Sequence, residues 1–143
     1  MDFFEKTYGL ISKYNQKAKK AKYYGTDDLL YPAEVHIIEI IGAHDGITTT
    51  EIANILGITK GAVSQTTNKL ISKELIIKAV SAVRANEVSI SLTEKGKTVF
   101  GYHREMHRAM RERVDAELSA LTPESREAIS NIVRILEESL KEI

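Results

Sequence analysis

The stretch GITKGAVSQTTNKL, residues 57–70, carries amides and hydroxyls where a helix that needed only solubility would carry Glu, Lys and Ala. The amides of Gln65 and Asn68 can each hold N6 and N7 of adenine through paired hydrogen bonds. The Ser64 hydroxyl can serve a donor or an acceptor on a base edge. These residue types therefore suit hydrogen bonding to base pairs in the major groove of a duplex.

Two cations and a glycine lie in the same stretch. Lys60 and Lys69 can reach guanine or a phosphate. Gly61 leaves room for close approach of the backbone, although it costs the helix about 1 kcal/mol against alanine. The exposed positions of residues 59–70 contain no acid, whose charge would repel phosphates. A polar face without acids can also arise by chance, so the elements that hold it decide the interpretation.

The surrounding signals predict two short helices joined by a tight turn. TTTE, residues 48–51, is a capping box that precedes a helix at 51–56. Gly57 suits the position just past the end of that helix. Thr59 can cap the next helix, which is expected to run to about Glu74. Two helices three residues apart with glycine in the turn form a helix-turn-helix.

The second helix is expected to have an inner and an outer face. Ala53 is small enough to let the two helices cross closely, while Val63 and Leu70 face inward. The same small core is expected to include Ile52, Leu56 and Ile58. Helical periodicity then directs six residues outward, namely Lys60, Gly61, Ser64, Gln65, Asn68 and Lys69.

A change of period follows the helix-turn-helix. Residues 76–82 and 87–93 are rich in β-forming residues, and the second run alternates apolar residues with serine. Residues 83–87 are expected to join them as a hairpin, which makes the unit a winged helix. Its local charge is modestly basic, with Lys60, Lys69, Lys73, Lys78 and Arg84 against Glu51, Glu74 and Glu87.

Helices are expected on both sides of this unit. Residues 2–23 repeat apolar residues at steps of three and four, and residues 25–32 read as a loop. Pro32 suits the start of a helix that is apolar nearly all round. Thr93 is expected to cap a long helix to about Leu121, and a last helix follows from Thr122-Pro123.

The order of these elements resembles the MarR family of bacterial and archaeal transcriptional regulators. The similarity is strongest over residues 31–96, and the run SLTEKG at 91–96, which closes the wing and opens the next helix, is a fairly specific mark of it. The resemblance implies a mainly α (α+β) winged helix-turn-helix fold and an obligate homodimer on a pseudo-palindromic operator, where it usually represses transcription. It also implies release of DNA by a small aromatic or phenolic effector, which the sequence does not identify.

The tip of the wing departs from the family pattern. The family usually places an arginine pair there, but the corresponding positions are Ala85 and Asn86. Arg84 is then the cation left to reach the minor groove. With Arg84, the predicted DNA-binding residues are Thr59, Lys60, Gly61, Ser64, Gln65, Asn68 and Lys69.

The terminal helices have apolar stripes that the winged core does not use. We therefore expect residues 1–143 to form a single MarR-like domain, with a DNA-binding core at 31–93. Residues 1–24 and 94–143 would form a helical dimerisation region, because a 16.0 kDa monomer would leave their stripes exposed. The alternative is that these helices pack back on their own core.

Other side chains favour simpler interpretations. His103 and His107 are four residues apart, as a two-histidine metal site needs, but no cysteine or third ligand accompanies them, so no metal is expected. An aromatic acid could be met by Tyr14, Tyr23, Tyr24, Tyr31 and His36, with Lys17 or Lys20 pairing its carboxylate. The alternative is that Tyr14 and Tyr31 pack in the core and the lysines face solvent. The basic run KAKKAK, residues 17–22, could be a solvated face or could attract nucleic acid.

Composition excludes several classes of protein. The chain has no cysteine, which removes disulfides and thiol chemistry, and its 20 basic and 20 acidic residues balance. No membrane span, signal peptide, catalytic constellation or cofactor motif is recognised, so we expect a cytoplasmic protein that is not an enzyme. Double-stranded DNA is the expected partner. The rival hypothesis is a winged-helix module that binds a protein with the same face.

Overall fold

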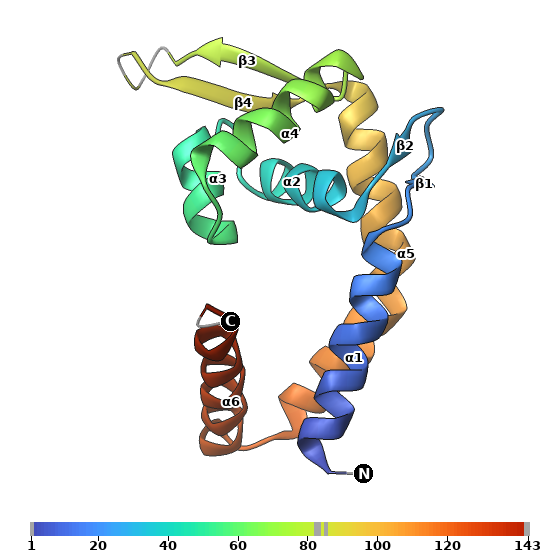
Figure 1. Ribbon diagram of the computed structural model, residues 1–143, viewed down its shortest axis with the longest axis vertical. Coiled ribbons are helices and arrows are strands. Elements are labelled where there is room, and N and C mark those ends of the chain that lie inside the picture. Colours follow the sequence, from blue (N-terminus) through green and yellow to red (C-terminus); the bar gives the residue numbers. More distant parts are fainter. Residues whose placement is uncertain (1, 82–83, 85, 142–143) are drawn as a thin grey trace. The chain divides into compact units, whose positions relative to one another are not determined.

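The computed structural model describes residues 2–81, 84 and 86–141. It divides into two compact units, Met1–Arg104 and Glu105–Ile143. The first unit contains five helices, α1 to α4 and the start of α5, with two small antiparallel sheets (Figure 1). The second contains the remainder of α5 and the last helix. The predicted winged helix-turn-helix fold is confirmed.

The helix-turn-helix forms as its capping residues predicted. Helix α3 (Thr49–Leu56) begins with Thr48, whose hydroxyl accepts from the Glu51 N–H while the Glu51 carboxylate accepts from the Thr48 N–H. Gly57 ends α3 in the left-handed conformation with φ of 64°. Helix α4 (Lys60–Ser72) begins at Thr59, whose hydroxyl accepts from the Ala62 N–H at 3.1 Å.

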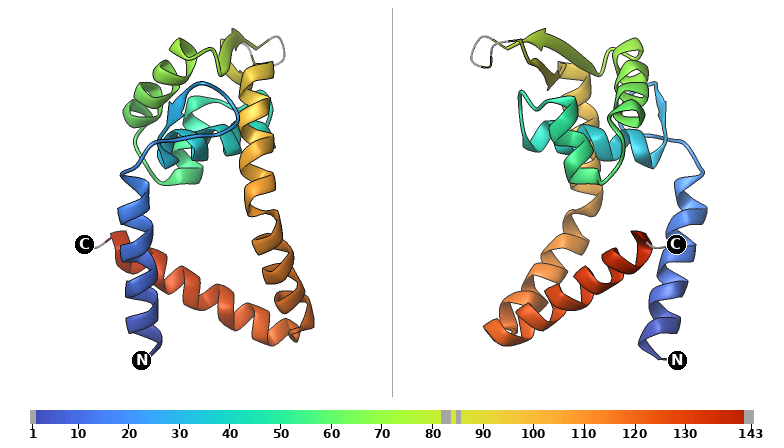
Figure 2. Two further views of the ribbon diagram at one scale, coloured as in Figure 1. Left: turned by 90° about the vertical axis from the view of Figure 1, so that its right-hand side faces the viewer. Right: turned by 60° about the vertical axis from the view of Figure 1, so that its left-hand side comes forward.

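Helix α2 (Pro32–Ala43) supplies much of the core behind these helices. Val35, Ile37, Ile38 and Ile41 are buried along it, as expected for a helix that is apolar nearly all round. Strands β3 (Ile76–Val80) and β4 (Val88–Leu92) pair antiparallel, with Ile76 opposite Leu92. Ile90 is buried and forms an isolated bridge with Ile47, which ties the wing to the segment before α3. The strands project beyond the helical core (Figures 1 and 2).

The prediction of one helix over residues 2–23 is wrong at its end. Helix α1 spans Phe3–Ala18, and strands β1 (Lys22–Tyr23) and β2 (Leu29–Leu30) form a small hairpin within residues expected to be helix and loop. The hairpin turns the chain so that Tyr24 and Leu30 enter the core, where 5% and 0% of their surfaces are exposed. Burial of these two apolar side chains therefore overrides the continuing helical pattern.

Helix α5 (Glu94–Ala120) begins against the wing and the end of α4. Thr93 caps it as predicted, because its hydroxyl accepts from the Gly96 N–H at 3.0 Å. Gly96 is buried at this crossing, and a Cβ added there would overlap the carbonyl oxygen of Leu75. Glycine therefore lets the helix approach the backbone before β3.

The second unit contains the C-terminal half of α5 and helix α6 (Pro123–Lys141). The Thr122 hydroxyl accepts from the Ser125 N–H at 3.2 Å and so caps α6. No described residue of this unit is fully buried, and large apolar side chains along both helices stay exposed. Within the described part of the chain, no helix has the length and apolar character needed to cross a membrane.

Candidate nucleic-acid interface

Helix α4 presents one buried face and one open face. Val63, Thr67 and Leu70 are completely buried. Lys60, Gly61, Gln65, Asn68 and Lys69 are exposed, as is Thr59 at the cap, while Ser64 is partly exposed. The orientation expected from periodicity is therefore present, with the two amides on the open face.

One residue beside α4 differs from expectation, and one residue within it adds a polar side chain to the buried face. Ile58 was expected in the small core, but 44% of its surface is exposed, because it lies in the turn after the left-handed Gly57. Its N–H donates to the carbonyl of Ala53 while the side chain stays outside. Thr67 instead lies fully inside, and its hydroxyl donates to the Ser64 carbonyl at 3.1 Å. That bond satisfies the buried hydroxyl, which makes threonine acceptable on an apolar face.

The cations near α4 fall into two groups. Among the described residues, Lys60 and Lys69 have no ion-pair partner and remain available to an anion. Lys73 caps the end of α4, and its ammonium donates to the buried carboxylate of Glu34 at 2.7 Å and to the Leu29 carbonyl at 3.1 Å. Lys73 is therefore occupied within the fold. It does not add to the positive charge offered by the open face.

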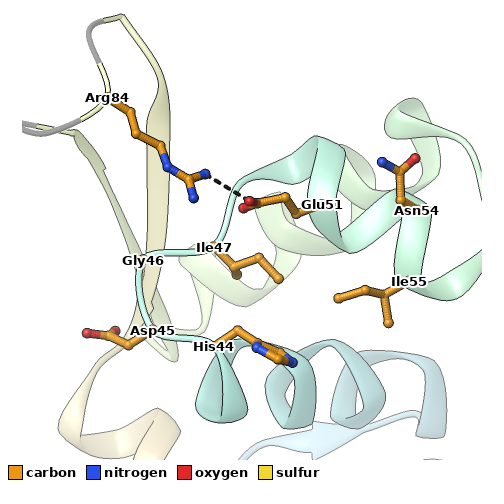
Figure 3. Close-up of a pocket in the computed structure, with 8 residues that line it drawn as sticks. All are labelled: His44, Asp45, Gly46, Ile47, Glu51, Asn54, Ile55 and Arg84. Carbon is orange, nitrogen blue, oxygen red and sulfur yellow. Dashed lines mark hydrogen bonds and ion pairs between the residues drawn. The ribbon is translucent and has the colours of Figure 1, made fainter.

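Arg84 at the wing is also paired. Its guanidinium donates to Oε1 of Glu51 at 2.8 Å (Figure 3). It also lies 3.5 Å from Oε2 of Glu87. The hydrogen bond from Arg84, aided by the Thr48 N–H, lowers the pKa of Glu51 to about 2. Arg84 is predicted to reach DNA. In this structure its guanidinium is exposed to solvent but held in ion pairs with Glu51 and Glu87.

A hollow of about 480 Å³ lies beside this ion pair. Its lining comes from the turn after α2, from α3 and from the wing, and comprises His44, Asp45, Gly46, Ile47, Glu51, Asn54, Ile55 and Arg84 (Figure 3). The Glu51 carboxylate and the Arg84 guanidinium point toward one another at its edge (Figure 3).

The expected wing tip is described only in part. Of the two positions where the family pattern expects arginines, Ala85 lies outside the described residues, as does Val83 within the predicted hairpin. Asn86 adopts the left-handed conformation with φ of 67°, which asparagine tolerates better than most residues.

His103 and Tyr14 each contact a side chain of helix α2. Nδ1 of His103 lies 2.7 Å from Oε1 of Glu39, and its ring lies 5.9 Å from that of Tyr24. Burial raises the pKa of Tyr24. The Tyr14 hydroxyl lies 3.3 Å from Nε2 of His36. Among the described residues, no three metal-ligating side chains gather in one place.

Known proteins share this core and fold. Residues 29–84 match the MarR family model. The HTH-type transcriptional regulator PchR of Bacillus subtilis (strain 168) is 27% identical over 107 residues, which cover 75% of this chain and 63% of that protein. The matched region thus spans less than two thirds of the length of this relative.

Solved structures extend the comparison to the whole chain. ZitR of Lactococcus lactis in complex with DNA is 25% identical, with a TM-score of 0.66 over 98% of this chain and 99% of that one. FabT of Streptococcus pneumoniae in complex with DNA is 23% identical and shares the fold, with a TM-score of 0.68 and 99% of each chain covered. Together the matches confirm the resemblance to the MarR family.

Proposed function

We propose that this MarR-family chain is a sequence-specific DNA-binding transcriptional regulator that binds a pseudo-palindromic operator as a homodimer. The main support is the open face of α4, where Gln65 and Asn68 lie between Lys60 and Lys69. Among the described residues, neither lysine has an ion-pair partner. Amides recognise adenine and lysines attract phosphates or guanine, so both recognition and affinity have a source on one face. The predicted contact set remains Thr59, Lys60, Gly61, Ser64, Gln65, Asn68, Lys69 and Arg84.

The homodimer is supported by apolar surface on the terminal helices. Large side chains on α1, α5 and α6 are roughly half exposed or more, including Phe4, Tyr8, Leu10, Met106, Met110, Val114, Ile132, Val133 and Leu140. Covering such stripes with a second copy removes them from water. A two-fold pair would place its two α4 helices about 34 Å apart, which is one turn of DNA.

The sign and control of regulation follow from the family resemblance. We propose repression in the cytoplasm, relieved by a small aromatic or phenolic effector. The relatives are regulators and not enzymes, and the proposed role requires no catalytic group. ZitR is described as zinc-responsive, so zinc joins the aromatic acids as a compound to screen for release of DNA.

Selection of bound sequences from a pool of random duplexes tests the proposal directly. We expect enrichment of one inverted repeat with half-sites about one turn apart, followed by specific binding in fluorescence anisotropy. The rival function, a winged-helix module that binds a protein, predicts no enriched sequence and equal binding to all duplexes. That result would overturn the proposal.

A further inference from the structure

The end of α1 and the following strand carry a dense group of lysines outside the α4 face. The lysine segment comprises Lys13, Lys17, Lys19, Lys20 and Lys22. No acid occurs between Glu5 and Asp27, so nothing in the local sequence neutralises this charge. All five residues are exposed. The segment therefore forms a concentrated positive surface on a chain whose formal net charge is zero.

The lysine segment differs from several other cations of the chain in having no acidic partner. Elsewhere Lys73, Lys95, Lys97, Arg108 and Arg134 each lie within 3.1 Å of a carboxylate oxygen. Across the described residues, no acid lies within ion-pairing distance of the lysine segment. Its charges are thus available to an anion from outside the chain.

Backbone pairing and a side-chain bond connect this segment to the end of α4. Lys22 in β1 pairs with Leu30 in β2. The carbonyl of the adjacent Leu29 accepts from the ammonium of Lys73, the residue that caps α4. Paired residues on antiparallel strands lie about 5 Å apart. The C-terminal part of the lysine segment is therefore a near neighbour of the end of the proposed recognition helix.

We infer that the lysine segment is a second, sequence-independent contact surface for the DNA backbone. The inference rests on the proposed function, since a duplex held by α4 would bring phosphates toward the neighbouring hairpin. Lys13 and Lys17 lie on one helix face about 6 Å apart along its axis, so adjacent turns present successive charges. Lysine binds phosphate as a flexible point charge and reads no base.

Neutralising three of these lysines tests the inference. The variant is Lys17→Gln, Lys19→Gln and Lys20→Gln. The control is Arg126→Gln, Arg134→Gln and Lys141→Gln on α6, which changes the net charge equally. Affinity for the selected operator and for an unrelated duplex of equal length is measured over a range of salt concentrations, with thermal unfolding as the check on folding.

We expect the lysine variant to weaken binding to both duplexes by the same factor. The slope of log K against log salt should become shallower by about 0.9 for each phosphate that the variant no longer neutralises. The α6 control should retain the wild-type slope. Extending the operator by flanking base pairs should strengthen the wild type and leave the lysine variant unchanged.

Three results would overturn the inference. If the wild type binds the operator and the lysine variant has the same slope of log K against log salt as the wild type, the inference is wrong. The proposed function is unaffected by that result. If the wild type binds no duplex, both fail together. If the slope is unchanged but the lysine variant loses binding to phosphatidylserine vesicles, the segment serves a membrane surface instead.

Discussion

The guanidinium of Arg84 donates to Oε1 of Glu51 at 2.8 Å, while Oε2 of the same carboxylate accepts from the Thr48 N–H at 2.9 Å. One carboxylate thus both completes the capping box of α3 and holds the wing. The cap uses Oε2 and the contact with the wing uses Oε1, so a substitution can remove one interaction and keep the other.

Removing Arg84 should raise the pKa of Glu51. The pKa is about 2 with Arg84 in place, against an ordinary value of 4.5. Arg84→Gln should move it toward 4.5, although the Thr48 N–H should still keep it somewhat below. A lowered pKa stabilises the fold above pH 4.5, and this contribution disappears as the pH falls toward 2. A carboxyl-carbon NMR titration checks this, and an unmoved Glu51 resonance would contradict it.

Glu51→Gln should make the wing arginine more available to DNA, because only its longer 3.5 Å contact with Glu87 would remain as an ion pair. Glutamine can still accept from the Thr48 N–H, so the cap is retained while the ion pair is removed. We expect the Glu51→Gln variant to bind every duplex more tightly than the wild type. The Arg84→Ala variant should bind more weakly, with a salt slope shallower by about 0.9. Anisotropy titrations at several salt concentrations measure both. Identical slopes for Arg84→Ala and wild type would mean that the wing makes no phosphate contact.

Substitutions on α4 should distinguish side chains that recognise bases from side chains that attract phosphates. Gln65→Ala or Asn68→Ala should cost roughly 1–3 kcal/mol on the selected operator and relax preference at one or two positions. Lys69→Ala should weaken binding to all sequences alike, because a phosphate contact carries no sequence information. Repeating the random-sequence selection with each variant provides the measurement. Unaltered preferences for both amide variants would show that the open face of α4 does not read bases.

A charge on the apolar stripe of α6 should disrupt the dimer. Ile132 is 42% exposed, and Ile132→Asp would place a carboxylate in the proposed contact between copies. Asn131→Asp adds the same charge at the neighbouring exposed position. Light scattering at micromolar concentration should show a monomer for Ile132→Asp and a dimer for Asn131→Asp. A wild-type monomer would overturn the dimer itself.

Gly96→Ala should destabilise the winged core. The added methyl would meet the Leu75 carbonyl oxygen, and relief requires the start of α5 to move. Such overpacking typically costs about 1–3 kcal/mol. Gly101→Ala on the same helix meets no atom within 4 Å and should stabilise by about 0.5–1 kcal/mol. Denaturant unfolding measures the stability of both variants. A Gly96→Ala protein as stable as the wild type would contradict the close crossing of α5 and the Leu75 backbone.

Much of the winged core could be predicted because its signals are local. Thr48, Thr59 and Thr93 cap helices through bonds to N–H groups three residues away. Gly57 ends α3 through its own conformational freedom. Periodicity likewise placed Val63 and Leu70 inside, because the pitch of a helix fixes which residues share a face. The DNA contacts of the opposite face stay a prediction.

The sequence alone determined the order of the helices and of the two wing strands, the caps, and an acid-free polar face on α4. Only the tertiary structure decided where α1 ends, that Ile58 stays outside, and which cations are occupied. Glu51 and Arg84 are 33 residues apart, and Glu34 and Lys73 are 39 apart. The physical reason is that local signals act within a turn or two of the chain. Burial of Tyr24 and Leu30, and the pairing of distant charges, depend on which segments the fold brings together.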